Sequence, residues 1–263
     1  MNRKADDTFS RRGFLARAGA IAAGAMIPRT GSTGTDTHSR LGNLHPGIAA
    51  IPYRSDVLSG SNVSLPLIRE MVDDALISIT GESTATTAMS HLLTEGTNDK
   101  SVAIKVNCIN SSTPTRWEMV RAITERLINA GISPSNIVIY DNQDLNGCGF
   151  NSTNFPNGSG EEFDGLQFLG RGSCPYPVPG TTCNLSERIV NADYLINAPV
   201  LKGHWGVTDQ NFHFTLGMKN HYGSISGLTH TFPDAREMLG RISADPVHVR
   251  PKTILIALSP HFL

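Results

Sequence analysis

VAIKVN, at residues 102–107, is the stretch that decides the fold, because this mainly apolar run reads as a strand. Apolar positions at helical spacing from Trp117 to Ile128 then predict a helix that ends at Gly131. Residues 137–140 predict a second strand after a proline turn. Strand, helix and strand in this order indicate a right-handed unit with two parallel strands.

Further elements extend this pattern on both sides. Ser64 can cap a helix with apolar residues at helical spacing, and Gly81 would end it. A short helix from Leu185 leads into a third strand, and another helix is expected from Thr208 or Asp209 to Gly223. The remaining predictions are the third strand at 194–198, a helix at 233–242 and a last strand at 253–258. We therefore expect an α/β fold with an open, mainly parallel sheet flanked by helices.

A long irregular insert rich in Gly, Asn, Pro and Ser separates Asn142 from Asn184. It can be a lid, an inserted hairpin or a disordered excursion, and we favour an ordered insert tied by cysteines. Cys174 and Cys183 flank a proline-rich turn and are the expected disulfide, although spacing alone does not determine the pairing. The four cysteines include no Cys-x-x-Cys pair, which disfavours a four-cysteine iron–sulfur cluster.

Length and charge limit the class of protein. A chain of 263 residues with 39% hydrophobic content can bury one large core. Its formal net charge of -1 argues against nucleic acid as a partner, which would require clustered Lys and Arg.

The N-terminus resembles a twin-arginine export signal. Arg11 and Arg12 are followed by Gly-Phe-Leu and by a small apolar run from Ala16 to Ile27. That run is shorter than the roughly 20 residues of a membrane-spanning helix, so no stable membrane span is expected. We predict a signal at 1–30, a linker at 31–62 and a single domain at 63–263. The twin-arginine translocation machinery is then a partner, and the protein is periplasmic or extracellular.

The segment from Asn197 to Gly223 concentrates lysine, histidine and glycine directly after the third strand. Ligands of open parallel sheets bind beyond the carboxyl ends of the strands. Asn107, Asp141 and Lys202 each follow such an end, and Lys105 inside an apolar strand requires a partner or a ligand. Asp141 is the expected partner of Lys105 if the two strands are neighbours. The alternative to a role in ligand binding is that this buried ion pair is purely structural.

The predicted site has two groups of residues. A lysine can neutralise an anion and a neutral imidazole can move a proton, so Lys202 and His204 are the catalytic candidates. His213 and His221 are weaker candidates for metal ligands, because a metal usually requires three or four converging ligands. We therefore assign no metal-binding residues, and the cofactor is unknown. The candidates for binding a ligand or cofactor are Lys105, Asn107, Asp141, Lys219 and Asn220.

Three motifs carry a family resemblance. LINAPVLKGH at 195–204, LGMKNHYG at 216–223 and the strand VAIKVN at 102–107 resemble the family called domain of unknown function 362. That family is largely uncharacterised; some members carry ferredoxin-like modules, and a likeness to nickel-pincer lactate racemases has been considered. This chain lacks the clustered cysteines of such a module. It also has Ala257 and Leu258 where similar proteins have an aspartate in the last strand, and its early end suggests truncation.

Three functional hypotheses follow. The leading one is an exported protein that binds an anionic or metal-containing cofactor or substrate in a strand-end cleft, for redox or isomerisation chemistry. The alternatives are a non-enzymatic exported binding module and a truncated, inactive remnant.

Overall fold

A five-stranded, wholly parallel sheet forms the centre of the protein. The computed structural model describes residues 49–60, 62–178, 182–200, 202–203, 214–215, 217–227 and 252–255. The strand order is β12-β8-β3-β4-β5, with bounds β3 (Val102–Lys105), β4 (Ile137–Asp141), β5 (Gln167–Gly170), β8 (Tyr194–Asn197) and β12 (Lys252–Leu255). The predicted α/β fold with a parallel sheet is confirmed.

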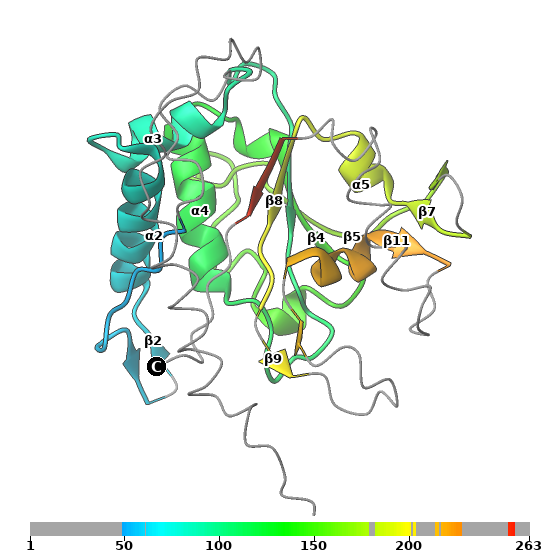
Figure 1. Cartoon of the computed structure of the whole chain (residues 1–263), viewed down its shortest axis with the longest axis horizontal. Coiled ribbons are helices and arrows are strands. Elements are labelled where there is room, and N and C mark those ends of the chain that lie inside the picture. The colour runs from blue at the N-terminus through cyan, green and yellow to red at the C-terminus, as the bar shows by residue number, and fades with distance from the viewer. Residues whose placement is uncertain are drawn as a thin grey trace, which may run out of the picture.

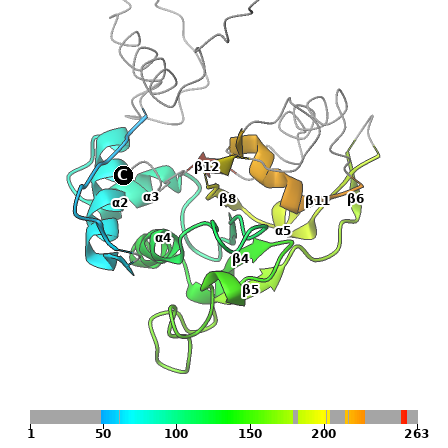
Figure 2. The same cartoon turned by 90° about the horizontal axis from the view of Figure 1, so that it is seen from below.

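Helices cover both faces of this sheet (Figures 1 and 2). One face carries α2 (Leu65–Thr80), α3 (Ala85–Leu92) and α4 (Trp117–Asn129), and the other carries α5 (Glu187–Val190) and the 3-10 helix η3 (Gly217–Ser224). Side chains alternate along β3, so Val102 and Ile104 join the core under α2 to α4, whereas Ala103 packs on the opposite face. Because side chains alternate, Lys105 points to the same face as Ala103, the face that carries η3.

The ends of these helices follow from local residues. Gly81 caps α2 at a φ of 73°, and its N–H donates to the carbonyl of Ile77, as the sequence predicts. Ser64 stands at the start of α2 but makes no side-chain cap. Helix α3 was not predicted from the sequence; its start is held by a reciprocal capping box between Thr84 and Thr87. Two short strands, β1 (Leu58–Ser59) and β2 (Asn62–Val63), form a hairpin ahead of α2.

The described part of the insert is ordered and contributes β5 to the edge of the sheet. Phe155 packs against the rings of Phe150, Phe163 and Phe168, with centroid separations of 6.2, 5.4 and 5.3 Å. Two single turns, η1 (Pro134–Asn136) and η2 (Asn146–Cys148), lie on either side of β4. Aromatic packing therefore holds this part of the insert together.

The expected disulfide between Cys174 and Cys183 is wrong: both are free thiols in this structure, and the pairing of two strands holds them apart. Strands β6 (Tyr176–Pro177) and β7 (Asn184–Leu185) pair antiparallel, and the N–H of Val178 donates to the carbonyl of Cys183. Cys183 is therefore opposite Val178, and Cys174 lies four residues before Val178, ahead of the start of β6. Four residues of extended chain span about 13 Å, too far for a disulfide.

The helix predicted from Thr208 or Asp209 to Gly223 is present only in part: η3 covers its end from Gly217 as a 3-10 helix, whereas Phe214 and Thr215 form a strand. The short strands β9 (Lys202–Gly203) and β10 (Phe214–Thr215) pair antiparallel, and β11 (Ile225–Ser226) follows η3 and pairs with β7. Gly217 has a φ of 52°, in the left-handed region, which interrupts a right-handed helix at that point. Residues 204–213 and the helix predicted at 233–242 lie outside the described residues.

None of the helices in the described residues is long and apolar enough to cross a membrane.

Candidate functional site at the carboxyl ends of the strands

Lys105 and Asp141 form a buried ion pair between two neighbouring strands. Strands β3 and β4 are paired, and Lys105 Nζ lies 2.8 Å from Asp141 Oδ1. The Lys105 side chain is 1% exposed and that of Asp141 is 5% exposed. Asp141, the partner predicted for Lys105 from the sequence, is therefore its partner in the structure.

All three donors of the Lys105 ammonium group are used inside the protein. Besides Asp141, Lys105 Nζ donates to the carbonyl of Val106 and, at 3.4 Å, to Asn220 Oδ1. Burial lowers the pKa of Lys105, and the charge and hydrogen bond of Asp141 oppose that effect. An ammonium group has three donors, so Lys105 organises the site and has no further hydrogen for a ligand.

Asp141 connects the two strand ends. In addition to Lys105 it accepts the backbone N–H of Cys108 on Oδ2 and that of Asn142 on Oδ1 at 2.7 Å. Cys108 follows β3 and Asn142 follows β4, so one carboxylate orients the backbone at both exits from the sheet.

Asn220 brings η3 to the same place. Its Oδ1 accepts from Asn107 Nδ2 at 3.1 Å, and its Nδ2 donates to Asn197 Oδ1 at 2.8 Å and to the carbonyl of Lys105 at 3.1 Å. Asn197 Nδ2 in turn donates to the carbonyl of Gly217 at 2.9 Å. Hydrogen bonds from β8, β3 and η3 therefore meet at a single amide.

Asn107 presents one polar atom without a partner among the described residues, namely its Oδ1. The residue is buried, and its backbone N–H donates to Thr115 Oγ1 at 2.8 Å, while Thr115 Oγ1 donates to the carbonyl of Ala198. A buried carbonyl oxygen without a donor is costly, so this atom is a place where a ligand or water can bind.

Lys202 lies beside this network. Its Nζ donates to the carbonyl of Thr113 at 3.2 Å, and no carboxylate of the described residues lies within ion-pairing distance. Burial lowers the pKa of Lys202, whereas the nearby Asp141 opposes that effect. Lys202 therefore supplies a half-buried positive charge at the strand ends.

The structure brings six of the seven predicted site residues into this region. Lys219 is half-buried on η3, next to Asn220. His204 and His213 lie outside the described residues. His221 is buried, with its Nδ1 3.3 Å from Ser224 Oγ, which lies 3.0 Å from the hydroxyl of Tyr140.

Asn197 and Gly223 belong to the site but were not among the predicted residues. Both lie in the segment from Asn197 to Gly223 that first indicated a site, and Asn197 ends a strand as Asp141 does. Gly223 matters because a Cβ there would lie 2.8 Å from Lys105 Nζ. Neither contact can be recognised before β8 and η3 are placed beside β3.

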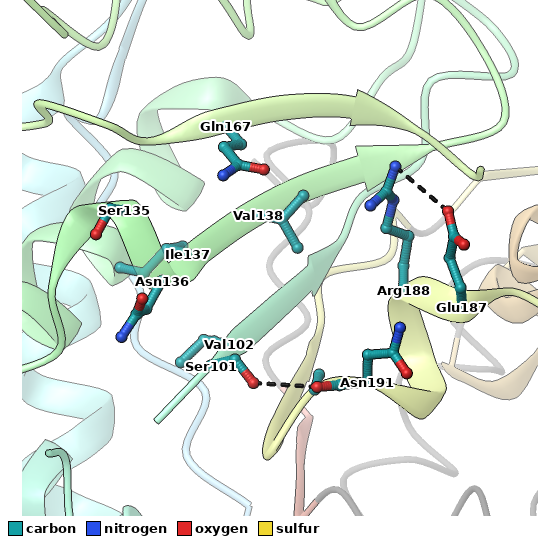
Figure 3. Close-up of a pocket in the computed structure, with 11 residues that line it drawn as sticks. Ser101, Val102, Ser135, Asn136, Ile137, Val138, Gln167, Glu187, Arg188 and Asn191 are labelled. Carbon is teal, nitrogen blue, oxygen red and sulfur yellow. Dashed lines mark hydrogen bonds and ion pairs between the residues drawn. The ribbon is translucent and has the colours of Figure 1, made fainter. Parts of the chain in front are cut away.

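Two hollows mark the surface at opposite ends of the sheet. One, of about 270 Å³, lies at the carboxyl ends between residues 111–117 and 147–149. The other, of about 230 Å³, lies at the amino ends and is lined by Ser101, Val138 and Gln167 among others (Figure 3). Its charged side chains, Glu187 and Arg188, lie 3.6 Å apart. The carboxyl-end hollow adjoins the polar network, so it is the better candidate for a ligand.

The described residues contain no cluster of three or more His, Cys, Asp or Glu side chains able to hold a metal ion.

The family model for Domain of unknown function (DUF362) matches residues 102–257, more than half of the chain. The chain belongs to the DUF362 family. A search of curated proteins found no match. The family match covers β3, β4, β8 and η3, and therefore every residue of the polar network in this DUF362 protein.

Proposed function

We propose that this DUF362 protein binds a small anionic ligand, one that carries a phosphate or carboxylate group, at the carboxyl ends of β3, β4 and β8. Lys202 supplies the positive charge, and Asn107 lies at the base of the site. Lys105, Asp141 and Asn220 position these groups, since their own hydrogen-bonding atoms are used within the protein. Lys219 follows on η3 as a second cation of this region.

The observation that carries this proposal is that, of two neighbouring lysines, only one is paired with a carboxylate. Lys105 is neutralised by Asp141, whereas Lys202 has only a carbonyl partner among the described residues. A half-buried ammonium group without a carboxylate favours an anion, because the anion restores the charge balance that burial disturbs. The sequence hypothesis of redox or isomerisation chemistry depends on His204 as a proton shuttle, and His204 lies outside the described residues.

Calorimetric titration of the full chain with inorganic phosphate, and separately with acetate, tests the proposal. We expect binding that weakens at high salt and that becomes at least about tenfold weaker in Lys202→Met. The control is Lys100→Met, because Lys100 already has a carboxylate partner, Asp193, 3.1 Å away at the opposite end of the sheet. Equal affinity in the two variants, or no binding of either anion by the wild-type protein, would refute the anion site.

We further propose that the protein is exported by the twin-arginine route, on the basis of Arg11, Arg12 and the apolar run that follows. Fractionation of cells that express the full chain tests this. The variant Arg11→Lys with Arg12→Lys should remain in the cytoplasm, while Arg3→Lys should be exported as the wild type is. Normal export of the double variant would contradict the signal assignment.

A further inference from the structure

We propose that Cys108 and Cys148 form an intramolecular disulfide beside the strand-end site. Cys108 follows β3 and Cys148 ends η2, 40 positions later in the chain. Both are buried free thiols, and Cys148 Sγ lies 3.9 Å from the carbonyl oxygen of Cys108. Each thiol also affects the pKa of the other, in agreement with this close approach. This pair replaces the Cys174–Cys183 pair that the spacing suggested.

Cys148 is the cysteine of this pair that faces the hollow. It lines the hollow at the carboxyl ends together with residues 111–117, whereas Cys108 does not. Burial raises the pKa of both thiols, but the neighbouring Cys108 side chain acts in the opposite direction on the pKa of Cys148, as does the charge of Lys202. Cys148 is therefore the first of the two to lose its proton and the one that an oxidant in the hollow can reach.

The oxidant is a second disulfide, either of a small molecule or of a protein. Cys148, as the thiolate, attacks one sulfur of that disulfide, a mixed disulfide forms, and the first oxidant thiolate leaves. Cys108 then loses its proton and attacks Cys148 Sγ, and the second oxidant thiolate leaves. Two cysteine thiols are thereby oxidised to one disulfide, and one external disulfide is reduced to two thiols. The two protons pass to solvent or to the leaving thiolates.

The new bond would tie the exit of β3 to the turn after β4. The backbone N–H of Cys108 donates to Asp141 Oδ2, so the cross-link would also restrain the carboxylate that pairs with Lys105. A disulfide that closes a loop of this length raises the free energy of unfolding substantially, because it reduces the conformational entropy of the unfolded chain. The inference concerns the cysteines alone and is independent of whether an anion binds.

Peptide mapping of the full chain distinguishes the possible pairings. The protein is incubated with glutathione disulfide, its remaining thiols are alkylated, and it is digested with trypsin without reduction. Cleavage after Lys and Arg places Cys108 in peptide 106–116 and Cys148 in peptide 127–171, whereas Cys174 and Cys183 share peptide 172–188. We expect peptides 106–116 and 127–171 to be joined and peptide 172–188 to be alkylated twice.

Two variants complete the test. The double variant Cys174→Ser with Cys183→Ser should still form the cross-link and lose both remaining thiols in a thiol titration. Cys148→Ser should not form it. Oxidation should raise the melting temperature by roughly 5 °C or more in the wild type and in the double variant, but not in Cys148→Ser. Separate alkylation of peptides 106–116 and 127–171, glutathione adducts without a cross-link, or closure of Cys174 onto Cys183 alone would each overturn the proposal.

Discussion

Gly223 and Asp141 are in contact with no room for a side-chain atom between them. A Cβ built on Gly223 would collide with Asp141 Oδ1 and would lie 2.8 Å from Lys105 Nζ. The backbone of η3 therefore covers the ion pair between β3 and β4 directly. This contact explains why a glycine follows Lys219 and Asn220 in the LGMKNHYG motif.

Gly223→Ala should destabilise the protein by about 1–3 kcal/mol, because the added methyl group forces the ion pair or η3 to move. Urea unfolding followed by circular dichroism measures the change. Gly170→Ala is the matched control, since a Cβ at Gly170 meets no atom within 4 Å, and it should cost less than about 0.5 kcal/mol. Equal effects of the two substitutions would contradict the close contact.

Lys105→Met should be strongly destabilising, by about 3–5 kcal/mol, because it leaves the Asp141 carboxylate buried without its cation. Lys100→Met removes a lysine of a more exposed pair, in which Lys100 and Asp193 are 28% and 34% exposed, and should cost less than about 1 kcal/mol. The free energies of unfolding from urea titrations give both values. Adding Asp141→Asn to Lys105→Met should recover part of the loss, and no recovery would argue against an uncompensated charge.

Glu118→Gln should stabilise the protein at pH 7 by about 1 kcal/mol. Burial raises the pKa of Glu118, so the folded protein holds this proton more tightly than the unfolded chain does. The stability that this proton provides is complete below the unfolded pKa, about 4.3, and is lost as the pH rises through the folded pKa. The gain from Glu118→Gln should therefore vanish below about pH 4 in urea unfolding curves, and a gain that persists there would contradict the assignment.

Glu125→Gln on the same helix should have the opposite effect and destabilise the protein at pH 7 by about 1–3 kcal/mol. Burial acts to raise the pKa of Glu125, but hydrogen bonds from Arg69 and Arg121 outweigh it, so the pKa is lowered. Arg69 Nε lies 2.6 Å from Glu125 Oε2 and joins α2 to α4. This stability is present above about pH 4.3 and is lost as the pH falls through the folded pKa. Unfolding curves from pH 3 to 7 should show the cost of Glu125→Gln decreasing with acid; a constant cost would contradict this assignment.

The order of the core elements could be predicted because each has a local cause. The apolar runs of β3, β4 and β8 are continuous since both faces of a parallel sheet are covered, and α2 ends where Gly81 takes a left-handed conformation. In contrast, β5 was not predicted, because Gln167 to Gly170 is a short, half-exposed edge strand inside a polar insert. Phe214 and Thr215 were misread as part of a helix, because nothing local shows that Phe214 pairs with Gly203.

Residue types and their positions in the sequence were sufficient to indicate an α/β protein with Lys105, Asn107, Asp141, Lys202 and Asn220 at strand or helix ends. A lysine in an apolar strand requires a partner whatever the fold, because an unpaired buried charge is costly. The tertiary structure alone decided which contacts satisfy that requirement. Asp141 and Asn220 use all but one of the donors of Lys105, and Lys202 has no carboxylate partner among the described residues. Cys108 lies beside Cys148, which comes 40 residues later in the chain. These are relationships between residues distant in the chain, and they exist only once the strand order and register bring those residues together.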